Sequence, residues 1–273
     1  MVFSRDALAG RVALITGGGS GIGLAIAKAF ASSGARLVLA SRNLDRLSTA
    51  VNEIRALGGE ALAVTADVRS YEQVENAVKT AVDTFGSMDI MVANAAGNFV
   101  VPAATMSPNA WKVVIEIDLN GTFFCARAAY SALRVSAFGG RLIAISTTRA
   151  LEGWPGCAHA GAAKAGIMSL IRTLASEWGP EGIRCNTIAP GAIGDTEGVK
   201  RIYEDQGRAE RELSSVPLGT FGKAADIASA AVYLCSDAGA YVNGADLVVD
   251  GGRNRSRAGS GTVGQPETKT CAG

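Results

Sequence analysis

Short apolar runs alternate with segments of helical periodicity along most of this chain. Residues 12–16 form an apolar, β-branched run that stops at glycines, as expected for a strand buried in a parallel sheet. Apolar residues then repeat at helical spacing over 22–30, which predicts a helix ending near Gly34. Six more strands are predicted at 36–41, 60–66, 88–93, 141–146, 183–188 and 246–249, and more helices at 43–57, 71–85, 118–138, 162–178 and 224–236. Ser107-Pro108 is typical of a helix start. This alternation predicts an α/β fold with a doubly wound parallel sheet of seven strands.

The composition indicates one domain with no nucleic-acid or membrane partner. With 273 residues, 48% of them hydrophobic, the chain can bury a large core. A formal net charge of +1 without dense Lys/Arg runs argues against nucleic acid. No uninterrupted apolar stretch reaches about 18 residues and the start does not resemble a signal peptide, so we expect a cytoplasmic protein. The five cysteines form no C-x-x-C pair, which favours buried free thiols.

The turn after the first predicted strand is rich in glycine. It reads Gly17-Gly18-Gly19-Ser20-Gly21-Ile22-Gly23 and leads directly into the first predicted helix. Such a turn directs backbone N–H groups and the positive end of a helix dipole at one point, and glycine lets a pyrophosphate approach the backbone. A strand before the turn and a helix after it therefore predict a nucleotide site.

The end of the second predicted strand indicates which nucleotide binds. An acidic residue about 20 positions beyond the glycines suits NAD, whereas an arginine suits the 2′-phosphate of NADP. Here the strand ends at Ser41-Arg42-Asn43, so we favour NADPH, although Arg42 as a solvated residue at a helix start is the alternative. Asp67-Val68, at the end of the third strand, can accept a hydrogen bond from the adenine amino group.

The order of motifs resembles the short-chain dehydrogenase/reductase family. Gly17-x-x-x-Gly21-x-Gly23 is followed by Asn94-Ala95-Ala96-Gly97, Pro190-Gly191 and Asp250-Gly251-Gly252. The resemblance implies a Rossmann-like NADP-binding domain over 1–253. The composition of 254–273, which is polar and Gly/Ser-rich, predicts a disordered tail. The cofactor residues that we predict are Gly17, Ser20, Gly21, Ile22, Gly23, Ser41, Arg42, Asp67, Val68, Asn94, Ala95, Ala96, Lys164, Pro190, Gly191 and Ile193.

The family's catalytic pattern is incomplete in this sequence. Family members usually carry a tyrosine four residues before a lysine, a serine thirteen residues before that tyrosine, and an asparagine three residues before a glycine. Lys164 is present, but Ala160 occupies the tyrosine position. Thr147 occupies the serine position, and Asp118 occupies the asparagine position before Gly121. Ordinary ketone reduction needs a proton on the developing alkoxide, which alanine cannot supply.

A conjugated thioester avoids this requirement, because hydride addition leaves a delocalised dienolate that is protonated on carbon. The departures at Asp118 and around Lys164 resemble the 2,4-dienoyl-CoA reductases of peroxisomal type and their bacterial relatives. The resemblance implies hydride transfer from NADPH to the δ-carbon of an acyl-CoA thioester in fatty-acid β-oxidation, then α-protonation to a 3-enoyl-CoA. It implies that Lys164 binds the nicotinamide ribose, that Asp118 and Lys164 position a proton-donating water, and that the protein is a homotetramer. We hypothesise that Thr147 hydrogen-bonds the thioester oxygen.

Other interpretations remain open. The protein can be a reductase of the same family with a different enoyl, ketoacyl or carbonyl substrate, or a catalytically silent nucleotide-binding module. Asp118 can be only a helix N-cap, Lys164 only a ribose ligand and Thr147 only a packing residue. His159, the one histidine, is interpreted as a partly buried imidazole with satisfied hydrogen bonds. The long polar segment 194–216 is expected to be a substrate loop, whose Arg201, Arg208 and Arg211 contact CoA phosphates or solvent.

Overall fold

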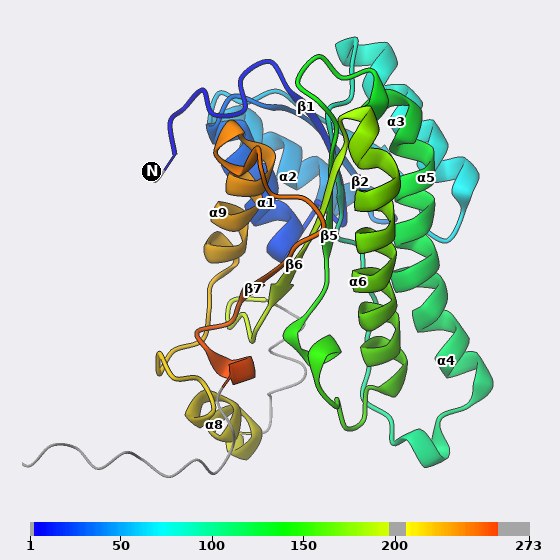
Figure 1. Cartoon of the computed structure of the whole chain (residues 1–273), viewed down its shortest axis with the longest axis vertical. Helices are drawn as coiled ribbons and strands as arrows, with labels where there is room; N and C mark the ends of the chain where they lie inside the picture. Colours follow the sequence, from blue (N-terminus) through cyan, green and yellow to red (C-terminus); the bar gives the residue numbers. More distant parts are fainter. Residues whose placement is uncertain (1–2, 197–205, 256–273) are drawn as a thin grey trace, which may run out of the picture.

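Seven parallel strands form the sheet at the centre of the protein (Figure 1). The computed structural model describes residues 3–196 and 206–255, and over this part of the chain the strand order is β3-β2-β1-β4-β5-β6-β7. The strands are β1 (Val12–Thr16), β2 (Arg36–Ser41), β3 (Ala61–Thr65), β4 (Ile90–Ala93), β5 (Arg141–Ile145), β6 (Arg184–Pro190) and β7 (Asp246–Val249). The chain builds outwards from β1 to β3, returns beside β1 with β4, and then builds outwards to β7. This order confirms the predicted doubly wound fold, and its switch point lies between β1 and β4.

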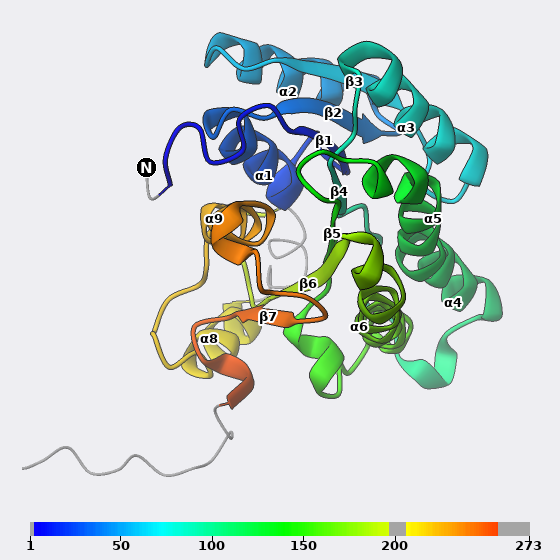
Figure 2. The same ribbon diagram turned by 45° about the horizontal axis from the view of Figure 1, so that its top comes forward.

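Helices cover both faces of the sheet (Figure 2). Strand residues alternate between the faces, so Leu14 packs into one core and Ile15 into the other. One core holds α1 (Gly21–Ser32), α2 (Leu44–Ala56) and α9 (Ala224–Cys235), and the other holds α3 (Tyr71–Phe85), α5 (Gly121–Arg134) and α6 (Ala158–Trp178). Both faces of the central strands are therefore buried, which explains their continuous apolar sequences.

The predicted helix at 118–138 begins ten residues too late. The helical segment starts as α4 (Pro108–Ile115), passes through a π-helical turn, η2 (Glu116–Asn120), and continues as α5 to Arg134. The predicted start at Ser107-Pro108 is confirmed, because the Ser107 hydroxyl accepts a hydrogen bond of 3.1 Å from Ala110 N. The N-cap interpretation of Asp118 is wrong, since this residue lies inside the π-helical turn. Likewise, α6 begins at Ala158 rather than at 162.

The segment expected to be a substrate loop contains a helix, α8 (Gln206–Ser214). Arg201 lies outside the described residues, and so does the expected disordered tail beyond residue 255, while Arg253–Arg255 form a short 3-10 turn, η6. No helix in the described ranges is both long and apolar enough to cross a membrane.

Four of the five cysteines lie in the described part of the chain, and all four are buried free thiols, as predicted: Cys125, Cys157, Cys185 and Cys235. Burial raises the pKa of Cys125, Cys185 and Cys235 to about 12. At neutral pH these thiols are protonated packing residues, because only the thiolate is a strong nucleophile or metal ligand.

Candidate functional site

A pocket of about 930 Å³ lies at the carboxyl ends of the parallel strands. The turn after β1 and the ends of β2, β4, β5 and β6 all contribute to its lining. The predicted site residues that line it are Gly17, Ser20, Gly21, Ile22, Ser41, Arg42, Asp67, Val68, Asn94, Ala95, Ala96, Asp118, Thr147, Lys164, Pro190, Gly191 and Ile193. Gly23 alone among them is absent from the lining. The pocket therefore combines residues whose sequence positions span most of the fold.

The turn after β1 has a backbone shape that requires glycine, and this shape suits the binding of a dinucleotide. Gly17 has φ +67° and Gly21 has φ +53°, a left-handed region that favours glycine. A Cβ on Gly17 would lie 2.7 Å from Asn94 Nδ2, and one on Gly23 would lie 2.3 Å from Gly17 O. Asn94 Nδ2 donates to Thr16 O at 2.9 Å and thereby fixes the turn to the end of β4. Gly23 thus allows close packing of the turn, while Gly17 and Gly21 leave an open cradle at the N-terminus of α1.

Polar and charged groups gather where β2 and β3 end. The Ser41 hydroxyl bonds the backbone of Asn43 at 3.3 Å, and the exposed Arg42 lines the pocket beside it. Arg69 donates to both carboxylate oxygens of Asp67, at 3.0 and 2.5 Å. That hydrogen bonding lowers the pKa of Asp67 although burial raises it, and the charge of Arg42 lowers it further. Arg42 and Asp67 line this end of the pocket, and Arg69 pairs with Asp67, so two guanidinium groups face one carboxylate, a charge balance that suits a phosphate.

Asp118 and Lys164 form a buried ion pair at the pocket. Lys164 Nζ lies 3.5 Å from Asp118 Oδ2 and donates to Ile145 O at 2.8 Å. The other carboxylate oxygen, Asp118 Oδ1, accepts a hydrogen bond of 2.8 Å from Gly97 N. Only 1% of the Asp118 side chain and 10% of the Lys164 side chain are exposed. These contacts fix both charged ends at the pocket lining, in a setting where water screens them little.

The pocket offers no phenol at the tyrosine position. Ala160 lines it there and is 1% exposed. The Ser146 hydroxyl donates to Lys164 O at 3.1 Å and so fixes the helix rather than the pocket. The Thr147 hydroxyl donates weakly to Pro190 O at 3.4 Å and accepts from Arg149 N at 3.3 Å. Among the predicted catalytic residues, Thr147 is therefore the one with a hydroxyl, and it lines the pocket.

His159 differs from its interpretation as an imidazole with satisfied hydrogen bonds. It is fully buried beneath the pocket wall, and its ring packs edge-to-face against Phe99 with 4.7 Å between centroids. Nδ1 accepts from Ala160 N at 2.7 Å, whereas Nε2 has no hydrogen-bond partner among the described residues. Burial lowers the pKa of His159, and the nearby charge of Asp118 opposes that effect. The imidazole is therefore neutral near pH 7, with its proton on Nε2.

Sequence reasoning missed an apolar wall and two charged residues of the pocket. Phe99, Val100 and Trp154 line it from two loops, at 97–102 and 152–157. Val101 N donates to Gly156 O at 2.8 Å, which holds these loops together. The two missed charged residues are Arg149 and Glu212. None of these residues belongs to a periodic segment or a motif, although Trp154 followed by Pro155-Gly156 marks an aromatic side chain in a turn.

The parallel sheet, the glycine cradle at its switch point and the buried lysine beside it define a dinucleotide-binding α/β oxidoreductase. A family model described as "Enoyl-(Acyl carrier protein) reductase" matches residues 17–254, and the chain belongs to the short-chain dehydrogenase/reductase family.

Named relatives and solved structures agree with this placement. The "Probable 2,4-dienoyl-CoA reductase [(2E)-enoyl-CoA-producing]" of Bacillus subtilis is 42% identical, over 89% of this chain and 96% of that protein. The "Peroxisomal 2,4-dienoyl-CoA reductase [(3E)-enoyl-CoA-producing]" of Danio rerio is also 42% identical, over 92% of this chain and 84% of that protein. The crystal structure of a short chain dehydrogenase from Bacillus anthracis superposes with a TM-score of 0.80 at 41% identity, covering 89% of this chain and 96% of that one.

Proposed function

We propose that this protein is an NADPH-dependent 2,4-dienoyl-CoA reductase. The observation that carries the proposal is the replacement of the phenol by Ala160 in a pocket that contains a buried Asp118–Lys164 ion pair. Such a pocket cannot protonate an alkoxide with a tyrosine, but it can stabilise charge that is spread over a conjugated thioester. The names of the relatives at 42% identity support the same substrate class.

The cofactor proposal rests on the two ends of the pocket. The glycine cradle with the α1 N-terminus suits the pyrophosphate, and Arg42 with the Ser41 hydroxyl suits a 2′-phosphate. Lys164 would hold the nicotinamide ribose, close to Asn94 and the small side chains that follow it. NADPH, when bound there, supplies the hydride.

The proposed mechanism uses three side chains, those of Thr147, Lys164 and Asp118. The Thr147 hydroxyl donates to the thioester oxygen, giving up its weak 3.4 Å bond to Pro190 O. As hydride reaches the δ-carbon, electrons move through the diene into the thioester, and the Lys164 ammonium stabilises the developing negative charge. Asp118 and Lys164 then orient a water that protonates the α-carbon, which gives a 3-enoyl-CoA and consumes one proton from solvent.

The apolar wall gives the acyl chain a place to bind. Phe99, Val100 and Trp154 lie in the same pocket as the ion pair, and an acyl chain against them would gain apolar contact while excluding water. The proposal retains the homotetramer that the family resemblance implies, and the cytoplasmic location expected from the sequence.

NADPH consumption with 2,4-hexadienoyl-CoA tests the proposal. Turnover with release of 3-hexenoyl-CoA supports it. Turnover only with β-ketoacyl or ketone substrates would indicate another reductase of the family, and tight NADPH binding without turnover would indicate a silent nucleotide-binding module. The product must be identified as well, because the names of the relatives differ between (2E)- and (3E)-enoyl-CoA.

A further inference from the structure

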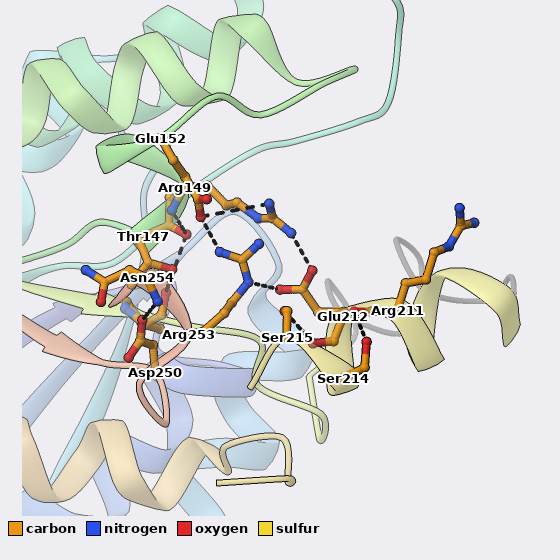
Figure 3. A network of polar contacts seen from close by, with 12 residues as sticks. Thr147, Arg149, Glu152, Arg211, Glu212, Ser214, Ser215, Asp250, Arg253 and Asn254 are labelled. Carbon is orange, nitrogen blue, oxygen red and sulfur yellow. Dashed lines mark hydrogen bonds and ion pairs between the residues drawn. The ribbon is translucent and has the colours of Figure 1, made fainter. Parts of the chain in front are cut away.

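Four charged side chains form an ion cluster beside the pocket (Figure 3). Arg253 donates from Nε to Glu212 and from Nη1 to Glu152. Arg149 donates from Nη2 to the second carboxylate oxygen of Glu212, and its Nη1 lies 3.8 Å from Glu152. Two positive and two negative charges therefore balance within one cluster, and both Arg149 and Glu212 also line the pocket.

The cluster connects three segments that are distant in the sequence. Arg149 and Glu152 belong to the 3-10 turn η3 (Thr148–Leu151) and its C-terminal cap, Glu212 belongs to α8, and Arg253 begins η6. Figure 3 shows the Arg211 side chain pointing away from the cluster, so Glu212 is the residue of α8 that joins it. The position of α8 is thus tied to the turn that directly follows β5.

This turn also carries the hydroxyl proposed to bind the thioester. Arg149 N donates to Thr147 Oγ1 at 3.3 Å, and Thr147 caps the start of η3. The side chain of Arg149 is held by Glu212, while its backbone N–H orients Thr147. A continuous chain of contacts thus runs from α8 through Arg149 to the pocket hydroxyl.

A buried cluster of ions is not the most effective means of stabilising a fold. The side chains of Glu212 and Arg253 are each 8% exposed. Burial lowers the pKa of Arg253, but the carboxylates of Glu212 and Glu152 raise it by more, so the net shift is upward. Well-packed apolar residues often stabilise such a position as well as buried ions do, whereas ions fix a defined geometry. The arrangement therefore favours a role in positioning.

We propose that Glu212 is a positioning residue for the Thr147 hydroxyl, acting through Arg149, and that it makes the geometry of the reaction centre depend on where α8 lies. This inference rests on the proposed function, because Thr147 is taken to bind the thioester. Movement of α8 on substrate binding would then change the orientation of the hydroxyl through Glu212. The mechanism assigns Glu212 no contact with the reacting atoms.

The test combines Glu212→Gln with Thr147→Val, singly and together. Glu212→Gln is nearly isosteric and removes one charge, so kcat with 2,4-hexadienoyl-CoA should fall about tenfold, while the Kd for NADPH stays within about twofold. In the Thr147→Val background the same change should lower kcat by less than about twofold, because the group on which it acts is gone. Asp237→Asn is the matched control, since Asp237 pairs with the buried Arg11 at the opposite ends of the strands.

Equal losses of kcat from Glu212→Gln in both backgrounds would overturn the inference, and so would an unchanged kcat in the single variant. A normal kcat for Thr147→Val beside a low one for Glu212→Gln would also overturn it. The double variant Glu212→Met/Arg253→Met tests the inference if Glu212→Gln fails to fold, because the double variant removes one charge of each sign. It should unfold at a temperature close to the wild type, yet show the same loss of about tenfold in kcat, and a normal kcat would contradict us.

Hydrogen exchange separates this inference from the proposed function. If the wild type does not reduce dienoyl-CoA, the proposed function fails, but the contacts of Glu212 can still be tested. Glu212→Gln should speed amide exchange about tenfold in a peptide covering 147–152 and leave β1 unchanged, whereas Asp237→Asn should leave both unchanged. Unchanged protection of 147–152 in Glu212→Gln would overturn the link between α8 and Thr147.

Discussion

Asp118 changes the charge of the pocket, because the family pattern has asparagine at this position. Asparagine at this position would keep the hydrogen bond from Gly97 N, so the difference between the two residues is the negative charge beside Lys164. A neutral side chain cannot hold a water and an ammonium in the same way, because the charge-assisted bonds are lost.

Asp118→Asn should therefore lower kcat by about a hundredfold while leaving the Kd for NADPH within about twofold, since the loss falls on proton transfer rather than on binding. Steady-state kinetics with 2,4-hexadienoyl-CoA and a fluorescence titration with NADPH measure both quantities. Asn120→Ala is the control, because Asn120 lies two residues away and bonds Glu116 instead of lining the pocket. Full activity in Asp118→Asn would show that the charge has no catalytic role.

His159 gives the molecule a stability that depends on pH. Burial lowers the folded-state pKa of this residue below the ordinary 6.5, so the unfolded chain binds the additional proton first as the pH falls. The stability linked to the neutral imidazole is complete above about pH 6.5 and declines as the pH falls towards the folded-state pKa.

Because the chain has one histidine, a His159→Gln variant isolates this effect. Between about pH 7.5 and about pH 5.5, the free energy of unfolding should fall more for the wild type than for the variant. Chemical denaturation at both pH values measures the difference. The carboxylates titrate in both proteins, so their contribution to the pH dependence of stability cancels in the comparison. Parallel pH profiles would therefore show that the buried imidazole does not resist protonation.

At the scale of elements, the strands were predictable and the helix boundaries were less so. Parallel strands buried on both faces have continuous apolar sequences, which mark 12–16 and 36–41 without reference to the rest of the fold. The start at Pro108 was predicted, but the helix over 118–138 was taken as separate, because Glu116, Asp118 and Asn120 interrupt the apolar pattern between them. The same interruption is where the chain forms a π-helical turn, a feature common at functional sites.

The β1–α1 turn supplies a prediction with an internal control. Gly17 and Gly58 both have positive φ, but only Gly17 has neighbours that a Cβ would strike. Backbone strain should cost about 1 kcal/mol of stability for alanine at either position, and the clash with Asn94 should add to this cost at Gly17. Gly17→Ala should also abolish NADPH binding, because the turn must move away from Asn94. Calorimetry of both variants measures affinity and stability together, and tight NADPH binding by Gly17→Ala would contradict the assignment of this turn.

At the scale of the whole molecule, the residues that line the pocket could be predicted because they follow strand ends. Such ends converge at one edge of a parallel sheet, so Gly17, Ser41 and Asn94 meet although they lie far apart in sequence. The ion cluster of Arg149 and Glu212 could not be found in this way. Its members come from non-periodic turns and from α8, and only the folded chain brings them together.

The same convergence predicts how NADPH stabilises the protein. The proposed site takes residues from β1, β2 and β4 and also from β5 and β6, so local opening on either side of the switch point would release the ligand. At NADPH concentrations a hundredfold above Kd, the free energy of unfolding should rise by about 2.7 kcal/mol. In a chain of this size the melting temperature should then rise by roughly 5–10 °C, in a single transition.

NADH at the same concentration should give a smaller shift, and Arg42→Gln should bring the NADPH shift down to that of NADH, because the 2′-phosphate then loses its guanidinium. Differential scanning calorimetry measures all three shifts. Two transitions, of which NADPH moves only one, would mean that the halves of the sheet unfold separately and that the ligand contacts just one of them.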